Sequence, residues 1–399
     1  MKIKLYFVKI SNIIFGLPIY LIFIVIRPII SIKIGRLYSS RLGHLNYDVD
    51  NYIFTKKANN INEFSIFVCE NYIANYEIYC KWNELESILL TKNFLYRNLI
   101  GFIEKFINNS SLLIHFEEMH HHTFASSSDQ NIFLSDEYKK KGIDFLSRFG
   151  IKKPYVCFHN RDATYLAKTQ KDGGDGNEHE FRDFEFDDYK DSIELLSKQN
   201  IQAVRIGELI QKKSKLKPNN LVSAVGEISN SHLISMIYHA DYAITGTSGI
   251  NQVSKTLRKP LLLVNYIPLY SDPTSMKEEF LIMFAPNTLI VPKKIYNKKD
   301  EKYLTLSEML NLNYDYNMKN FFKNLELEIV NNTPAEIAEA VDEMNKRIKC
   351  KWQDNEHQKH LQNKFWKLFE DNENYQYLRY ELKNNISSTF LSQNSFLLD

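Results

Sequence analysis

Four short segments of this 399-residue sequence combine residue types that could do chemistry. The first is RLGHL, from Arg41 to Leu45, which is expected to form a turn after a strand. Gly43 would let the backbone approach a ligand, and His44 would titrate near neutral pH, which suits proton transfer. Arg41 would then lie beside that ligand. The competing interpretation is a buried histidine that fastens a loop.

The second segment is HNRDATYL, which follows an apolar run at 155–159. Charged side chains directly after a buried strand are unfavourable unless they have partners. Arg161 offers the paired N–H donors that suit phosphate oxygens, and His159 lies two residues before it. Asp162 would either orient Arg161 or act as a base. A purely structural pairing of Arg161 with Asp162 is the alternative.

The third segment, FRDF, lies within an acidic stretch at 171–189 that also holds three glycines. The order of the acids does not match a calcium-binding loop, so the first half of the stretch reads as a solvated loop. Arg182 and Asp183 are held between two phenylalanines and are candidates for ligand contact. Arg205, in the VRIG sequence after another predicted strand, adds a further cation.

The fourth segment is GTSG, from Gly246 to Gly249, between a predicted strand and a helix that begins near Ile250. Backbone amides and the hydroxyls of Thr247 and Ser248 at a helix N-terminus suit a pyrophosphate. The segment lacks the GK[ST] element of a Walker A loop and is not GxGxxG. Glycine is scarce, 13 in 399 residues, so its placement here is more informative than usual.

Strands that alternate with helices must position these segments, which predicts an α/β fold with parallel sheets. Strands are expected over 32–38, 64–69, 112–116, 155–159, 203–206, 221–224, 242–245, 261–264 and 289–291. Helices are expected notably over 82–95, 189–199 and 231–238, and again from about 331 onward. This order predicts a doubly wound second half, with four parts at 1–30, 31–150, 151–330 and 331–399.

The N-terminus carries Lys2, Lys4 and Lys9 before an uncharged run at 11–26. Sixteen residues fall short of the ~20 that a spanning helix needs, and Pro18 would kink a helix. A signal peptide and a buried helix are both open alternatives. We favour a helix that lies on the cytoplasmic face of the inner membrane, with its lysines on anionic headgroups.

Composition excludes several classes of protein. The formal net charge of +2 argues against a dedicated nucleic-acid binder, so no nucleic-acid partner is expected. The four cysteines form no CxxC pair, which indicates neither a disulfide framework nor a structural zinc site. We interpret the histidines at 120–122 as a surface run without a metal, and the lysines after Pro292 as a solvated face.

Together RLGHL, HNRDATYL, FRDF, VRIG, DYAITGTSG and the ending STFLSQNSFLL resemble a family of bacterial GT-B-like glycosyltransferases found with surface-polysaccharide genes. The resemblance covers about residues 32–398. It implies two Rossmann-like domains, with C-terminal helices and the apolar N-terminal helix added to them. It also implies transfer of a sugar from a nucleotide sugar to a glycan or lipid-linked acceptor, with no cofactor and no bound metal.

HNRD also resembles the phosphate-binding segment of GT-B fucosyltransferases, which implies that Arg161 holds the donor diphosphate. From their residue types, we expect His44 or Asp162 to take the acceptor proton if the reaction inverts the anomeric centre. Arg41 and Gly43 would lie on the acceptor side. The remaining expected donor-binding residues are His159, Arg182, Asp183, Arg205, Gly246, Thr247, Ser248 and Gly249. Two alternatives stay open: a nucleotide-sugar 2-epimerase or hydrolase of the same fold, and a non-catalytic scaffold of a polysaccharide assembly complex.

Overall fold

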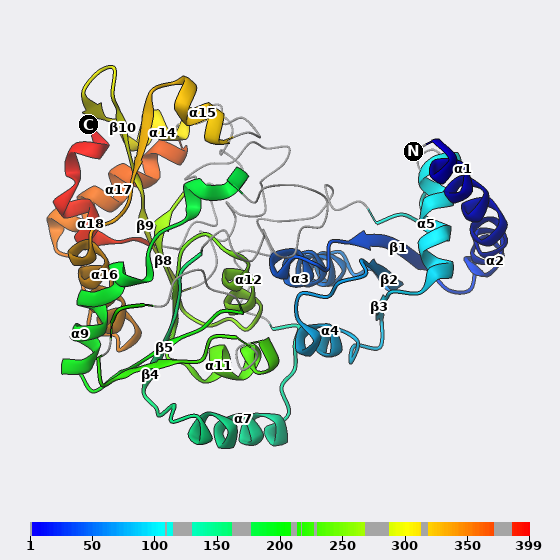
Figure 1. Cartoon of the computed structure of the whole chain (residues 1–399), viewed down its shortest axis with the longest axis horizontal. Coiled ribbons are helices and arrows are strands. Elements are labelled where there is room, and N and C mark those ends of the chain that lie inside the picture. The colour runs from blue at the N-terminus through cyan, green and yellow to red at the C-terminus, as the bar shows by residue number, and fades with distance from the viewer. Residues whose placement is uncertain are drawn as a thin grey trace. The chain divides into compact units, whose positions relative to one another are not determined.

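The structure is a computed structural model that describes residues 2–107, 110–114, 130–161, 177–208, 214–216, 218–226, 230–267, 287–312, 318–370 and 385–399. Contacts group these residues into two compact units (Figure 1). Unit 1 holds the described residues up to 114 together with 131–133, and unit 2 holds residue 130 and those from 134 onward. The predicted α/β class, with a parallel sheet in each unit, is confirmed. The four-part division at 30, 150 and 330 stays a prediction.

Unit 1 is built on a small parallel sheet in the order β1-β2-β3. Its strands are β1 (Ile32–Leu37), β2 (Phe64–Cys69) and β3 (Ile88–Thr91). Its helices after the N-terminal segment are α3 (Leu42–Ala58), α4 (Tyr76–Trp82) and α5 (Phe94–Phe106). Helices α3 and α5 lie on opposite sides of the sheet (Figure 1). The expected strand at 112–116 is represented by a single parallel bridge between Leu113 and Ile34.

The helix expected over 82–95 is wrong, because β3 lies within that range. Helix α4 ends at Trp82, whose indole N–H donates to the carbonyl of Leu45 at 3.0 Å. Ile88 and Leu90 then alternate into the core, which is the pattern of a half-buried strand. Short apolar runs of this kind are ambiguous between helix and strand, and only tertiary pairing with β2 decides the matter here.

The N-terminal segment is one continuous run of helix formed by α1 (Lys2–Ser11), a π-helical turn η1 (Asn12–Gly16) and α2 (Leu17–Ile26). Pro18 does not break it, because the π-helical turn precedes the proline and places it in the first turn of α2. The apolar helix is therefore longer than the sequence suggested. Tyr6–Ile26 gives 21 residues of mean hydropathy 2.1, enough by length and composition to cross a membrane.

The N-terminal helix packs closely on α5 along one face. A Cβ atom on Gly16 would come within 2.5 Å of the carbonyl oxygen of Asn98, and one on Gly101 within 2.5 Å of the Asn12 amide nitrogen. The hydroxyl of Ser11 donates to the Asn98 side chain at 2.7 Å. Gly16 thus lets its helix approach the backbone of α5, and Gly101 leaves room for the Asn12 side chain.

Unit 2 contains a seven-stranded parallel sheet in the order β6-β5-β4-β7-β8-β9-β13. Its first six strands by sequence follow the doubly wound order 3-2-1-4-5-6 of a dinucleotide-binding fold. The strands are β4 (Tyr155–His159), β5 (Gln202–Arg205), β6 (Leu221–Ser223), β7 (Ala243–Thr245), β8 (Leu261–Tyr266), β9 (Thr288–Pro292) and β13 (Asn385–Ile386). The predicted doubly wound second half is confirmed.

Helices cover both faces of this sheet, with α9 and α16 together on one side and α11 and α12 on the other (Figure 1). The α-helices of unit 2 are α7 (Asp136–Arg148), α9 (Lys190–Lys198), α11 (Leu233–His239), α12 (Gly249–Thr256), α14 (Leu306–Leu310), α15 (Met318–Asn324), α16 (Pro334–Ile348), α17 (Glu356–Glu370) and α18 (Ser388–Gln393). Its 3₁₀ helices are η3 (Asn177–Arg182), η4 (Phe186–Tyr189) and η7 (Ser395–Leu398). A small antiparallel sheet joins β11 (Lys302–Tyr303), β10 (Lys294–Asn297) and β12 (Leu327–Val330).

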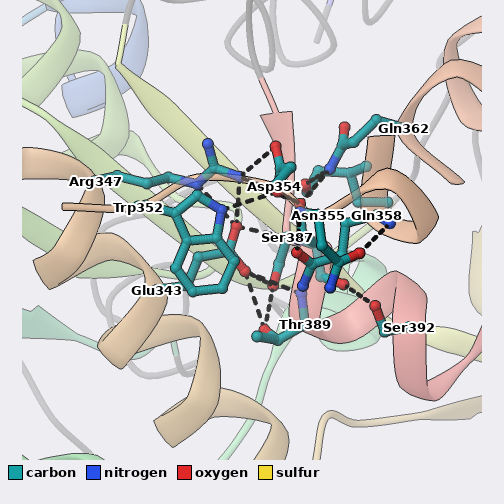
Figure 2. A network of polar contacts seen from close by, with 12 residues as sticks. Glu343, Arg347, Trp352, Asp354, Asn355, Gln358, Gln362, Ser387, Thr389 and Ser392 are labelled. Carbon is teal, nitrogen blue, oxygen red and sulfur yellow. Dashed lines mark hydrogen bonds and ion pairs between the residues drawn. The ribbon is translucent and has the colours of Figure 1, made fainter. Parts of the chain in front are cut away.

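A buried polar network fastens the C-terminal segment to α16 (Figure 2). The fully buried carboxylate of Glu343 accepts hydrogen bonds from the backbone amides of Ser388 at 3.1 Å and Thr389 at 3.0 Å. It also accepts from Arg347 at 2.8 Å and from the hydroxyl of Ser387 at 2.8 Å. This network holds the segment that follows β13, so the seventh strand depends on residues distant in sequence.

Candidate functional site

The site is built where the order of strands in unit 2 reverses direction. Strands β4 and β7 are neighbours, and the chain leaves them toward opposite sides of the sheet. In doubly wound folds ligands bind in the crevice outside the carboxyl ends of the strands at this switch point. Here β4 ends at His159 and β7 ends at Thr245. HNRD and GTSG, which were predicted separately, therefore follow two adjacent strands.

The residues after β4 are held by buried polar contacts. The hydroxyl of Tyr189, which is fully buried, donates to the carbonyl of His159 at 2.9 Å, and the His159 ring nitrogen Nδ1 lies 3.2 Å from the carbonyl of Ile206. That distance is compatible with donation from Nδ1–H. The side chain of Arg161 is about one-tenth exposed and forms an ion pair with Asp183. The carboxylate of Asp183 thus fixes the direction of the Arg161 guanidinium at the edge of the sheet.

The FRDF segment docks on the ends of both strands. The Asn160 amide donates to the carbonyl of Phe184 at 3.0 Å, and Asp183 pairs with Arg161. The ring of Phe184 packs on Gly246, where a Cβ atom would lie 2.6 Å from Cε1 of the ring. The structure thus brings FRDF, HNRD and GTSG together, and it gives Gly246 a packing role that the sequence did not show.

Lys293 is a residue that the sequence analysis missed. The prediction of a solvated lysine face after Pro292 is wrong at this position and the next, because Lys293 is 2% exposed and Lys294 is 8% exposed. The ammonium of Lys293 donates to the carbonyls of Phe181 at 2.9 Å and Asp183 at 3.0 Å. Burial lowers the pKa of Lys293 to about 8, with the Asp183 carboxylate opposing that shift and Arg161 adding to it. Nothing in the lysine-rich sequence after Pro292 indicates that the Lys293 side chain is buried.

Two further arginines lie in the same part of unit 2. Arg205, at the end of β5, places its guanidinium 4.0 Å from the centre of the Phe186 ring and donates to the Asn160 side chain at 3.3 Å. Arg182 lies 5.0 Å from the ring centre of Phe181. Both arginines are under 10% exposed. Together with Arg161 and Lys293, these arginines make four buried cationic side chains in or beside the segments at the sheet edge. Such a group of cations suits the binding of an anion.

The GTSG segment forms the turn into α12. The buried hydroxyl of Thr247 donates to the carbonyl of Ile267 at 3.0 Å, so this hydroxyl ties β7 to the end of β8. Ser248 is the N-cap residue of α12, and its hydroxyl lies 3.1 Å from that of Thr245. Gly249 is the first residue of the helix, and both Ser248 and Gly249 are partly exposed. The helix N-terminus therefore lies at the switch point, and the helix begins beside Ile250, where the sequence predicted its start.

Unit 1 holds the RLGHL segment. The expectation of a turn there is wrong in its extent, because Arg41 is the N-cap of α3 and Gly43 and His44 lie in the first helical turn. The Nδ1 atom of His44 lies 3.3 Å from a carboxylate oxygen of Asp48, one helical turn later. Asp48 is 4% exposed, and the ring of Tyr38 lies 5.5 Å from that of His44. Unit 1 thus presents a half-buried His–Asp pair, of which the sequence analysis identified only the histidine.

Other predicted positions cannot be placed. Asp162, the histidines at 120–122 and the glycines at 173–176 lie outside the described residues. Among the residues that are described, no group of three or more His, Cys, Asp or Glu side chains could hold a metal ion.

Comparison with known proteins gives similarity to solved structures only. Neither a protein-family profile nor a curated protein sequence matches the chain. A family 9 glycosyl transferase from Veillonella parvula DSM 2008 aligns with 78% of this chain and 79% of its own, at 12% identity and a TM-score of 0.37. The E. coli ADP-heptose LPS heptosyltransferase II aligns with 80% of this chain and 99% of its own, at 11% identity and a TM-score of 0.44.

A third solved structure is the dodecameric iron-containing heptosyltransferase TibC in complex with ADP-D-beta-D-heptose. It aligns with 79% of this chain and 76% of its own, at 10% identity and a TM-score of 0.39. At these values the similarities do not establish a family for this chain. The functional conclusion therefore depends on the site itself.

Proposed function

We propose that the chain is a glycosyltransferase that moves a sugar from a nucleotide-sugar donor to a glycan or lipid-linked acceptor in surface-polysaccharide synthesis. The observation that carries the proposal is the gathering of buried cations and a helix N-terminus at the switch point of a nucleotide-binding sheet. This combination suits a diphosphate, whose charge would be met by Arg161 and by the amides that begin α12.

The chemistry assigned to unit 2 is stabilisation of the leaving group. When the bond between the sugar and the diphosphate breaks, negative charge grows on the nucleoside diphosphate. Arg161, oriented by Asp183, and the other buried cations would stabilise that charge in a site of low dielectric constant. The transfer would in this way proceed without a metal ion on the diphosphate.

The chemistry assigned to unit 1 is activation of the acceptor. In the proposed reaction His44 takes the proton of the attacking hydroxyl as the new bond to the sugar forms. The contact with Asp48 would hold Nδ1 protonated and stabilise the imidazolium that results. Asp162 is the other proposed base, and Arg41 and Gly43 are proposed to lie on the acceptor side.

The decisive experiment is calorimetric titration of the full chain with UDP, GDP, ADP and CMP and with their sugar conjugates. We expect one nucleotide series to bind, and Arg161→Ala, in a chain that circular dichroism shows to be folded, to weaken its affinity by at least about tenfold. Arg148→Ala removes an exposed arginine of α7 and is the matched control. Unchanged nucleotide affinity in Arg161→Ala would defeat the assignment.

Turnover then separates the transferase from the alternatives. A transferase consumes the donor sugar only slowly until an acceptor glycan or lipid-linked glycan is added. An epimerase or hydrolase would convert the nucleotide sugar without any acceptor. Failure of the chain to bind any nucleotide would favour a scaffold role.

A further inference from the structure

All the charged side chains in the first 47 residues of the chain are positive. Residues 1–47 contain seven lysines and arginines, and the first acidic residue of the sequence is Asp48. In the whole chain the two signs nearly balance, at 50 basic and 48 acidic residues. Three of these cations, Lys2, Lys4 and Lys9, belong to α1, and Arg27 is the C-cap residue of α2. The side chains of Lys9 and Arg27 are both exposed. Such a distribution complements a negatively charged partner surface.

Apolar side chains are exposed along the same helix at an unusual density. Of the 26 exposed large apolar side chains among the described residues, 13 lie between Tyr6 and Ile30. Phe7 is 67% exposed, Val25 is 75% exposed and Ile29 is 84% exposed. Phe94 and Leu95, in the first turn of α5, are exposed as well. An apolar surface of this size, flanked by cations, is typical of a site that meets lipid.

The helix is long enough to span a bilayer, about 30 Å, yet its packing argues for a position along the surface. Gly16 is in backbone contact with α5, and Phe23 belongs to the core that α5 and the sheet of unit 1 share. Helix α5 is itself fastened by charged groups, including the bidentate pair of Arg36 with Glu104 at 2.7 Å. Spanning would require that the helix leave this core or that charged groups enter hydrocarbon, and both are costly.

We propose that α1, η1 and α2 form a monotopic membrane-binding surface, which lies in the plane of an anionic bilayer with its exposed apolar face in the acyl boundary. Lys9 in α1 and Arg27 at the end of α2 meet the headgroups. The opposite face stays packed on α5, so the membrane is bound by unit 1 as a folded body. This inference does not depend on the proposed transferase activity.

Flotation of the full chain with vesicles tests the proposal. We expect binding to phosphatidylcholine vesicles that contain phosphatidylglycerol, and weaker binding to phosphatidylcholine alone. The double variant Phe7→Glu/Val25→Glu should lower the partition coefficient by at least about tenfold. The matched control is Phe133→Glu, which changes a 77% exposed side chain of unit 1 outside this surface and should leave binding unchanged.

Charge is tested separately. Lys9→Glu/Arg27→Glu should reduce binding to the anionic vesicles and abolish their advantage over neutral ones. Equal binding of the wild type to both kinds of vesicle would overturn the headgroup assignment. The full chain could instead fail to bind vesicles and form dimers that Val25→Glu dissociates. That result would show that a second copy covers the surface, and it would overturn the proposal.

The side of the membrane on which residue 2 lies distinguishes a helix that lies on the membrane from one that spans it. In sealed inverted membrane vesicles from expressing cells, an impermeant maleimide should label Lys2→Cys as fast as the exposed native Cys80, since both stay on one side. Protection of the thiol at residue 2 while Cys80 is labelled would show a spanning helix and overturn the proposal.

Discussion

The ring of Phe184 occupies the space in which a side chain on Gly246 would begin, with its Cε1 atom 2.6 Å from the position of a Cβ atom. A real Cβ at that distance would force the ring to move. Phe184 is 6% exposed and follows Asp183, the ion-pair partner of Arg161. The glycine therefore controls how closely the FRDF segment approaches the sheet edge.

Gly246→Ala should lower the free energy of unfolding by about 1–3 kcal/mol, because it overpacks a buried contact. It should also weaken nucleotide binding through displacement of Asp183. Chemical denaturation and calorimetry measure the two effects. Phe184→Leu in the same chain should restore part of the lost stability, and strict additivity of the two substitutions would contradict the contact.

Lys293 should make nucleotide binding depend on pH. Its pKa of about 8 means that the buried ammonium loses its proton as the pH rises from about 7 to 9, with Asp183, Arg161 and Asp188 as the charged groups that act on it. Affinity for a nucleoside diphosphate should then fall by about tenfold, since one positive charge is lost. Lys293→Met should bind more weakly at pH 7 and should lose this pH step.

The expected fall in nucleotide affinity with rising pH would not arise from unfolding caused by Lys293. The pKa of Lys293 is lower in the folded protein than its ordinary value of 10.5, so the unfolded chain binds more protons between about 8 and 10.5. Over that range this group increases stability as the pH rises. If the midpoint of thermal unfolding fell together with affinity, the assignment of the step to Lys293 would be wrong.

The pair formed by His44 and Asp48 should matter for turnover and not for donor binding. His44→Gln should reduce the transfer rate by about 10²–10⁴-fold, because it removes the proposed base. Asp48→Asn should reduce the rate less and should shift its pH profile. Nucleotide affinity, measured by calorimetry, should be unchanged in both. A normal transfer rate in His44→Gln would assign the base to another residue.

Glu343 should be a large contributor to the stability of unit 2. Glu343→Ala leaves the amides of Ser388 and Thr389 and the guanidinium of Arg347 without their buried acceptor. We expect a loss of about 3–5 kcal/mol in chemical denaturation. Glu194→Ala, at an exposed position of α9, is the matched control and should cause no measurable change. An equally small effect of both would contradict the role of the network.

The sequence predicted unit 2 well because its strands are short apolar runs that end in polar or glycine residues. The runs before HNRD and GTSG are examples, and their strands are adjacent in the sheet. The burial of charged side chains could not be predicted from local sequence patterns of this kind. The sequence predicted Lys293 to be solvated and made no prediction for Asp48, and both side chains are buried in the structure. The start of α3 was missed because Gly43 signals a turn and Arg41 is a weak N-cap.

The seventh strand of unit 2 imposes an order of assembly. A chain made from its N-terminus completes the strands up to β9 long before Asn385–Ile386 exists, so β9 remains an open edge during that interval. Lys293 follows directly after β9, which places it beside the last part of the sheet to be sealed. Competence to bind an anion would thus mature late in synthesis, after the helices around the site have already formed.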